Sequence, residues 1–183
     1  FGNYGDFGLR SGFYTICNCV HFEQVDEAMP LFIEAPLLFS PGNDFEYSTF
    51  DVIAASKAVE TVTRRPFLES LDHYLFTPLE MNDTFGDNAA DVAGNEAVFY
   101  ELHQNTFRKW RSKNLSSHKV NISYKWAGGG LISTPSDMVK MGNVLVSDST
   151  FVSQDVRDDF WEPVVLANGE VNEQLYASGW RSY

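Results

Sequence analysis

The sequence predicts a globular chain that is mainly helical, with a strand near its C-terminal end. Hydrophobic residues make up 44% of the 183 residues and charged residues 21%. This is the balance of an ordinary folded domain and not of a disordered or fibrous chain. Apolar residues recur at helical spacing in several stretches, and Pro or Gly residues separate these stretches, as expected at turns and helix ends.

The first half of the chain predicts three helices. A short one lies within residues 23–35 and ends before Pro36, because the residue before a proline avoids the helical region. A second has apolar residues at near-helical spacing over residues 52–62 and basic residues at its end, where the helix dipole favours positive charge. The third begins at Pro66, a residue suited to a first helical turn, and stops at Thr77.

The second half predicts a polar excursion and then a fourth helix. Residues 82–119 are polar, which indicates little core. At the fourth helix we expect Thr134 to act as the cap, Pro135 to fill the first turn and the Asp137 side chain to reach back to the cap amide. The expected buried stripe of this fourth helix consists of Met138, Met141, Val144 and Leu145.

Near the C-terminal end, residues 176–180 are expected to begin a strand.

Charge and composition exclude several classes of function. Thirteen basic residues against 25 acidic ones give a net charge of −12, which repels phosphate backbones, so no nucleic-acid partner is expected. No apolar run reaches the roughly 18 residues needed to cross a bilayer, so no transmembrane segment is expected. The chain opens on Phe1 without a targeting peptide, and we expect it to be the interior of a longer protein.

Two cysteines, Cys17 and Cys19, are too few for a disulfide scaffold. With His21 they form a Cys-x-Cys-x-His pattern, which would place three soft ligands on one strand face. A zinc site needs a fourth protein ligand or a water, and often looser spacing. Free thiols are therefore the favoured interpretation, and no metal or other cofactor is expected.

Tyr47 stands between a Pro-Gly turn at residues 41–42 and the start of the second helix. A side chain there can project into a cleft while the helix behind it holds the backbone still. A tyrosine phenol carries protons at neutral pH only where positive charge lowers its pKa from about 10, and a lysine from elsewhere in the fold would supply that charge. The alternative is a buried tyrosine with a hydrogen-bonded hydroxyl.

Three consecutive glycines at residues 128–130 form a second unusual feature. Glycines are costly to order, so the run indicates a close approach of two backbones. The alternative is a tight turn in which no side chain fits.

These segments, in this order, resemble the serine β-lactamase/penicillin-binding-protein superfamily in its class C branch, most closely its mitochondrial members in animals. Tyr-Ser-Thr-Phe at 47–50 and Ser-Tyr-Lys-Trp-Ala-Gly-Gly-Gly at 123–130 are the most specific strings, and the similarity runs over residues 25–147. The resemblance implies an α+β, β-lactamase/transpeptidase-like fold. Residues 1–183 would supply mainly its helical region and part of its sheet layer, as a partial domain.

The resemblance also implies an active-site serine hydrolase with three motifs. Tyr47 falls on the tyrosine of the second motif, which the family uses to move protons to and from the nucleophile and the leaving group. Thr49 falls where many relatives carry an asparagine that orients the substrate, so it is the expected substrate-binding residue. A hydroxyl cannot supply the paired donor and acceptor of an amide, which argues against β-lactam-like recognition.

The other two motifs are expected outside this chain. Ser116 and Lys119 do spell Ser-x-x-Lys, but they follow the tyrosine by 69 residues (116 − 47), whereas the family places its nucleophile before it. Short matches of this kind often arise by chance. No Lys-Thr-Gly follows Trp180, so the chain by itself is expected to be inactive.

For the intact protein the resemblance implies peptidase or amidase activity, through an acyl-enzyme, on a peptide-like or acyl substrate. It also implies a mitochondrial location, a link to mitochondrial lipid metabolism and assembly into homo-oligomers. The alternatives for its function are a filament-forming scaffold with little hydrolytic activity and a non-hydrolytic, penicillin-recognising sensor. The alternative for its location is secreted or periplasmic.

Overall fold

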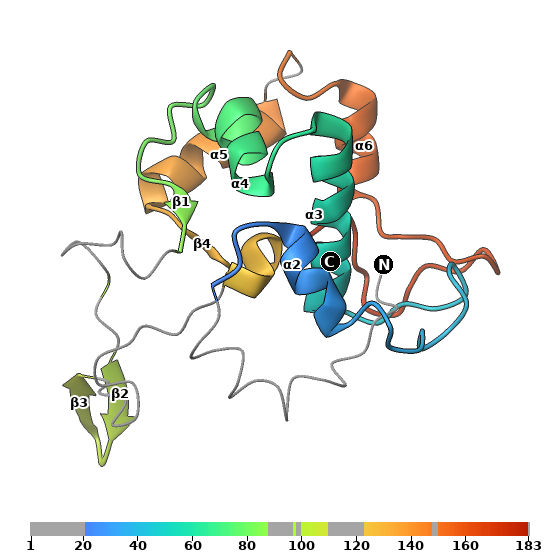
Figure 1. Ribbon diagram of the computed structural model, residues 1–183, viewed down its shortest axis with the longest axis horizontal. Coiled ribbons are helices and arrows are strands. Elements are labelled where there is room, and N and C mark those ends of the chain that lie inside the picture. Colours follow the sequence, from blue (N-terminus) through green and yellow to red (C-terminus); the bar gives the residue numbers. More distant parts are fainter. Residues whose placement is uncertain (1–20, 88–96, 98–99, 110–122, 148–149, 183) are drawn as a thin grey trace.

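Helices dominate the fold, as the sequence predicts (Figure 1). The computed structural model describes residues 21–87, 97, 100–109, 123–147 and 150–182. The helices are α2 (Val25–Ala28), α3 (Thr49–Thr63), α4 (Phe67–Leu71), α5 (Pro135–Ser147) and α6 (Gln154–Trp161), with shorter helical turns η1 (Met29–Leu31), η2 (Asp72–Phe76) and η3 (Ser123–Gly128). The strands are β1 (Phe85–Gly86), β2 (Tyr100–His103), β3 (Thr106–Lys109) and β4 (Leu131–Ile132).

The strands form two small antiparallel sheets. β1 pairs with β4, so that Phe85 lies opposite Ile132. β2 and β3 form a hairpin that lies apart from the helices in Figure 1. Its two loop residues, Gln104 and Asn105, both have positive φ (47° and 60°), the turn geometry that matches the twist of a two-residue hairpin. The described residues thus form an α+β arrangement.

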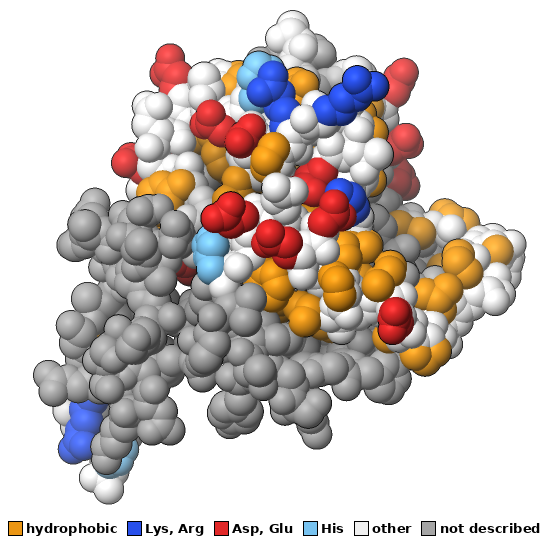
Figure 2. All heavy atoms as spheres, in the orientation of Figure 1, with side chains coloured by type: hydrophobic (Ala, Val, Ile, Leu, Met, Phe, Trp, Pro, Cys, Tyr) orange, Lys and Arg blue, Asp and Glu red, His pale blue; other side chains and the backbone are white. Residues whose placement is uncertain are grey.

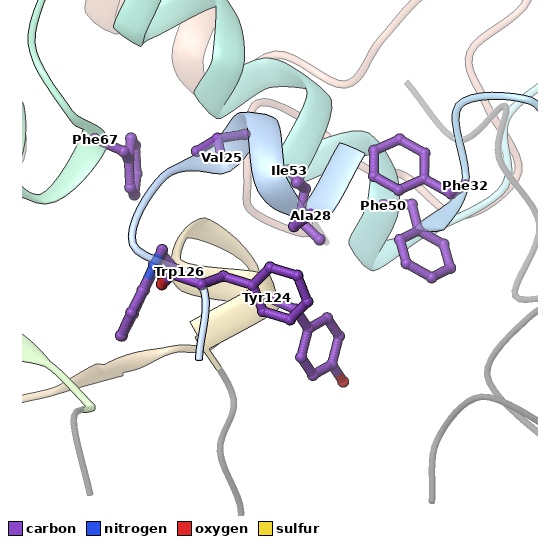
Figure 3. Close-up of a cluster of buried hydrophobic side chains, with 9 residues drawn as sticks. Val25, Ala28, Phe32, Phe50, Ile53, Phe67, Tyr124 and Trp126 are labelled. Carbon is purple, nitrogen blue, oxygen red and sulfur yellow. Dashed lines mark hydrogen bonds between the residues drawn. The ribbon is translucent and has the colours of Figure 1, made fainter. Parts of the chain in front are cut away.

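The core lies where α2, α3, α4 and η3 meet (Figure 3). Phe32 and Phe50 stack with ring centroids 4.7 Å apart. Trp126 of η3 donates a hydrogen bond from Nε1 to the Phe22 carbonyl (3.2 Å), and the Ser123 hydroxyl accepts one from the Phe22 amide (2.8 Å). The buried cluster consists of Phe22, Val25, Ala28, Phe32, Phe50, Ile53, Phe67, Tyr124 and Trp126.

The second expected helix is confirmed as α3, and Ile53 of its apolar pattern is buried, but the later residues of that pattern are not. Val62 is 83% exposed, whereas Glu60 is buried. The Glu60 carboxylate accepts hydrogen bonds from the Val25 amide (3.4 Å) and the Phe67 amide (3.0 Å). The first amides of a helix lack partners within it, and a carboxylate is favoured beside them. Glu60 is therefore buried because it stabilises the N-termini of α2 and α4.

The turn signals are confirmed with small shifts. The Asn43 amide donates to the Ser40 carbonyl (3.1 Å), and Gly42 between them has a φ of 85°, as a Pro-Gly turn requires. α3 ends on Arg64, whose φ of 57° is left-handed. Pro66 is the residue just before α4 and not its first helical residue.

The prediction that the Asp137 side chain reaches back to the cap amide of α5 is wrong. Thr134 does cap α5, since its Oγ1 accepts the Asp137 amide (3.3 Å). However, the buried Asp137 carboxylate accepts the Asp83 amide (2.8 Å) and the Thr84 hydroxyl (3.0 Å) through Oδ2, and Lys140 Nζ (2.9 Å) through Oδ1. The carboxylate is thus used to hold the loop before β1 against α5. A contact 54 residues away along the chain has no local signature in the sequence.

The expected apolar stripe of α5 is also wrong. Met138 is 48% exposed, and Met141, Val144 and Leu145 are only half-buried. Asp137 is the one buried residue of this helix. Polar contacts hold both ends of α5 instead: Asp137 at the start, and Arg157 Nη1, which donates to the Val146 carbonyl (3.0 Å), at the end.

The C-terminal residues make turns and not the expected strand. Tyr176 and Arg181 form an isolated bridge, and the Ala177 amide donates to the Trp180 carbonyl (2.8 Å). The glycine-rich start with Cys17 and Cys19, the Ser-x-x-Lys string at 116–119 and most of the polar excursion lie outside the described residues.

The loss of folding stability at acid pH is expected to depend on Asp137. Its pKa is lowered, first by the hydrogen bond from Lys140 and then by those from Asp83 and Thr84, against the opposing effect of burial. A carboxylate whose pKa is lowered by folding stabilises the fold fully above its unfolded pKa of about 3.9, and this stabilisation is lost as the pH falls through the folded-state pKa.

We therefore expect Asp137→Asn to reduce the free energy of unfolding at pH 7. The difference from wild type should shrink as the pH falls from about 4 through the lowered folded-state pKa, because the carboxyl group of Asp137 then becomes neutral in the folded protein as well. Urea denaturation of the two proteins across this pH range measures it. A difference that stayed constant with pH would contradict the assigned ionic contacts.

Candidate active site

The start of α3 fixes the backbone beneath Tyr47. Ser48 is the N-cap, with an extended backbone (φ −143°, ψ 136°), and its hydroxyl accepts the Phe50 amide at 3.1 Å. Ser48 and Phe50 are both buried, at 3% and 2% exposure. Because the residues on either side of Thr49 point into the core, Tyr47 is left on the outside, with 46% of its surface exposed.

Tyr47 is thus not the buried core tyrosine that was the alternative interpretation. Its ring lies against Tyr176, with centroids 5.5 Å apart and the planes tilted by 56°. Tyr176 in turn stacks on the buried ring of Phe45 at 5.2 Å. Within the described part of the chain, the Tyr47 hydroxyl makes no hydrogen bond, and no lysine or arginine lies over its ring. The cation that a proton-carrying phenol needs is not among these contacts, and the role of Tyr47 stays a prediction.

Thr49 lies in the first turn of α3 and is half-buried. Its methyl group faces Gly128 of η3, where an added Cβ would come within 2.6 Å of Thr49 Cγ2. Thr49 therefore contributes at least to packing between α3 and η3. Its expected part in substrate binding stays a prediction.

The glycine run combines the expected close approach with the tight turn that was the alternative: Gly128 meets the Thr49 side chain, whereas Gly129 and Gly130 form the turn that follows η3. Beyond Gly128, a Cβ on Gly130 would lie 2.8 Å from the Trp126 Cα. Gly129 has a φ of 127°, a conformation that side chains other than glycine rarely adopt. The run lets η3 fold back on itself and rest on the start of α3.

The C-terminal segment, residues 162–182, forms one side of the site. No sequence signal predicted this placement. It lies beside the chain that precedes α3 in Figure 1, where the Ala167 amide donates to the Gly42 carbonyl (2.8 Å). Asn172 is fully buried within it. The Asn172 Nδ2 donates to the Val164 carbonyl (3.0 Å) and the Tyr176 carbonyl (2.9 Å), and Oδ1 accepts the Tyr176 amide (2.9 Å).

The face of the molecule drawn in Figure 2 has an acidic area and an apolar area. Figure 2 shows acidic side chains over α2 and α3, and hydrophobic side chains over the chain that precedes α3 and the C-terminal segment. The exposed apolar residues of these two segments include Leu37, Leu38, Val165 and Leu175. Among the described residues, no group of three or more His, Cys, Asp or Glu side chains is placed to hold a metal ion. None of the helices described is both long and apolar enough to span a bilayer.

Because Thr49 and Gly128 are in contact, a smaller side chain at position 49 should restore the stability that is lost when Gly128 is replaced by alanine. Gly128→Ala should lower the free energy of unfolding by about 1–3 kcal/mol, because the new methyl group overlaps the Thr49 methyl. Thr49→Ser removes that methyl and should restore most of the loss in the Gly128→Ala background. Denaturant unfolding of the two single variants and the double variant measures the coupling. Additive effects would show that the two positions are not in contact.

Comparison with models of protein families gives a decisive match to this chain. The Beta-lactamase model matches residues 11–182. The chain belongs to the beta-lactamase family. The resemblance of the Tyr-Ser-Thr-Phe and glycine-run strings to this superfamily is thereby confirmed.

Curated relatives of this beta-lactamase family chain include two mammalian proteins. It is 34% identical over 125 residues to the protein of Mus musculus named Serine beta-lactamase-like protein LACTB, mitochondrial, and equally to the Homo sapiens protein of that name. The aligned stretch covers 68% of this chain but only 21% of the mouse protein and 22% of the human protein. The chain therefore spans about a fifth of the length of these relatives.

Solved structures with the same fold confirm the β-lactamase/transpeptidase-like architecture. A penicillin binding protein from Bacillus halodurans matches with a TM-score of 0.71 and 22% identity, over 97% of this chain and 52% of its own. A D-amino acid amidase from Ochrobactrum anthropi SV3 matches with a TM-score of 0.66 and 20% identity, over 89% and 47%. An octameric penicillin-binding protein homologue from Pyrococcus abyssi matches with a TM-score of 0.61 and 21% identity, over 88% and 36%. At these identities the likeness establishes the fold alone.

Proposed function

We propose that the intact protein is an active-site serine hydrolase that cleaves an amide or ester bond of a peptide-like or acyl substrate. The observation that carries this proposal is the placement of Tyr47. Its ring is half exposed, while the residues next to Thr49 are buried and hydrogen-bonded at the start of α3. Membership of the beta-lactamase family supports the reaction class.

The proposed reaction has two stages. A serine hydroxyl, supplied from outside these 183 residues, attacks the substrate carbonyl carbon, and its proton passes through Tyr47 to the departing amine or alcohol. The products of this stage are an acyl-enzyme and the free leaving group. Water then attacks the acyl carbon, gives its proton back to the serine oxygen through the same phenol, and releases the acid. Backbone amides hold the oxyanion in both stages.

In this reaction Thr49 contacts the substrate and Tyr47 moves protons. The exposed phenol belongs to the residue two positions before Thr49, at the same end of α3. The acidic character of the chain favours neutral or cationic substrates over anionic ones. No metal or other cofactor is needed for this chemistry.

The test uses the purified intact protein, a fluorophosphonate probe that labels activated serines, and a panel of amino acid amides and esters. We expect covalent labelling that is lost on denaturation, and turnover of at least one amide or ester. Absence of both labelling and turnover would overturn the hydrolase proposal. Filaments under the electron microscope, together with that absence, would favour the scaffold alternative.

We further propose a mitochondrial location and assembly into homo-oligomers by analogy with relatives, and a link to lipid metabolism on the sequence resemblance alone. The mammalian relatives carry the word mitochondrial in their names, and one protein of the same fold is described as octameric. Fractionation of cells that express the intact protein, and sedimentation of the purified protein, test location and assembly. Recovery from a secreted or periplasmic fraction would support the alternative location.

A further inference from the structure

Tyr176 is the residue whose side chain meets the Tyr47 ring from the C-terminal segment. The two rings are 5.5 Å apart, and Tyr176 also stacks on Phe45 at 5.2 Å with nearly parallel planes (27°). Phe45 is buried, so it anchors the stack to the body of the fold. Tyr47 therefore lies against the ring of Tyr176, which is itself stacked on Phe45. Aromatic pairs at these separations are attractive beyond the area that they bury.

The backbone of Tyr176 is held by hydrogen bonds at both its amide and its carbonyl. The fully buried Asn172 side chain bonds both the amide and the carbonyl of Tyr176, and its remaining N–H donates to Val164. The Val164 amide also donates to the Tyr176 carbonyl at 2.9 Å. All the donors of the Asn172 amide are used, so its orientation is set by the surrounding backbone.

The Tyr176 phenol is held in its neutral form. Its pKa is raised, first by burial and then by the neighbouring Tyr47, with Arg181 acting in the opposite direction. A neutral phenol adds no charge beside a group that exchanges protons. This suits a residue that supports Tyr47 rather than one that reacts.

We propose that Tyr176, held by Asn172, is a positioning residue that fixes the ring of Tyr47 for proton transfer, an inference that rests on the proposed hydrolase function. The rings of the two tyrosines lie against each other, and among the hydrogen bonds of the described residues none joins their hydroxyl groups. Removing the ring leaves the Tyr47 phenol free to turn about its side-chain bonds. Misplacement of a catalytic group by about 1 Å can cost about 100-fold in rate.

The test is a double-mutant cycle in the intact protein, with an amide or ester that the wild type hydrolyses. Tyr176→Ala is expected to lower kcat by between about 10-fold and 100-fold with little change in KM. Tyr176→Phe keeps the ring and should stay within about twofold of wild type. Tyr74→Ala makes the same change at an exposed tyrosine of η2, outside the C-terminal segment, and should leave kcat unchanged. In the Tyr47→Phe background, Tyr176→Ala should have no further effect.

A second measurement reports the contact without activity. With 3-fluorotyrosine placed at position 47, Tyr176→Ala should shift and narrow the fluorine resonance, whereas Tyr176→Phe should leave it in place. An unchanged resonance in Tyr176→Ala would overturn the inference even if that variant were poorly active through partial unfolding.

The outcomes separate this inference from the proposed function. If Tyr47→Phe lowers kcat but Tyr176→Ala lowers it equally in both backgrounds, Tyr176 does not act through Tyr47 and the inference is overturned, while the hydrolase proposal stands. If Tyr47→Phe leaves kcat unchanged, the proposed role of Tyr47 in the hydrolase fails, and with it the catalytic part of the inference. A non-additive cycle together with a shifted fluorine resonance supports both.

Discussion

Tyr47→Phe in the intact protein is expected to lower kcat by about 100-fold to 10,000-fold, the range usual for loss of a positioned acid–base group. The substitution removes one hydroxyl and keeps the ring, so the packing against Tyr176 is retained. KM should change little, because the lost hydroxyl transfers protons during the reaction and does not bind the substrate. Steady-state kinetics on an amide or ester substrate measures the effect.

Tyr47→Phe should not change the stability of the fold. Within the described residues the Tyr47 hydroxyl has no hydrogen-bond partner, so its loss should leave the melting temperature unchanged. Tyr74→Phe, at a tyrosine that is 54% exposed on η2, is the matched control and should change neither kcat nor melting temperature. A Tyr47→Phe protein with wild-type kcat would contradict the proton-transfer role.

Gly130→Ala is expected to give the largest loss of stability among single methyl additions at the glycines that the structure describes. The new Cβ would lie 2.8 Å from the Trp126 Cα, 3.1 Å from the Trp126 amide nitrogen and 3.2 Å from the Lys125 carbonyl oxygen. All three are backbone atoms, which cannot turn aside as a side chain can. Overpacking of this kind costs about 1–3 kcal/mol, and η3 also carries Tyr124 and Trp126 of the core.

Gly142→Ala is the matched control for that substitution. Gly142 lies inside α5, and a Cβ there meets no atom within 4 Å. Alanine in a helix interior is favoured over glycine by up to about 1 kcal/mol, so this variant should be as stable as wild type or more so. Chemical denaturation of both variants checks the contrast. Equal losses in the two would mean that η3 is not folded as described.

Local signals predicted the parts of the fold that depend on neighbouring residues. The Pro-Gly turn at residues 41–42, the helix behind Tyr47 and the tight turn at the glycine run all follow from residues adjacent in sequence. The same signals placed Tyr47 at a fixed helix start, and the structure leaves its ring outside the core. The family strings predicted the fold class, which the family match and the solved structures confirm.

Contacts between distant residues could not be predicted in this way. The spacing within α5 indicated an apolar stripe, but the helix is held by Asp137, whose partners lie 53 and 54 residues away. Glu60 is buried because two other helices begin beside it, which no pattern within α3 shows. Asn172 and Tyr176 lie in a segment without regular secondary structure, so neither helical nor strand periodicity marks them.

Mapping the site of covalent labelling is the most direct test of whether Tyr47 assists a serine that these 183 residues do not contain. The intact protein is treated with a fluorophosphonate, digested, and the modified peptide is identified by mass spectrometry. We expect a single modified serine outside the 183 residues, with labelling that is markedly slower in Tyr47→Phe. Modification of Ser116, or labelling at an equal rate in wild type and Tyr47→Phe, would contradict it.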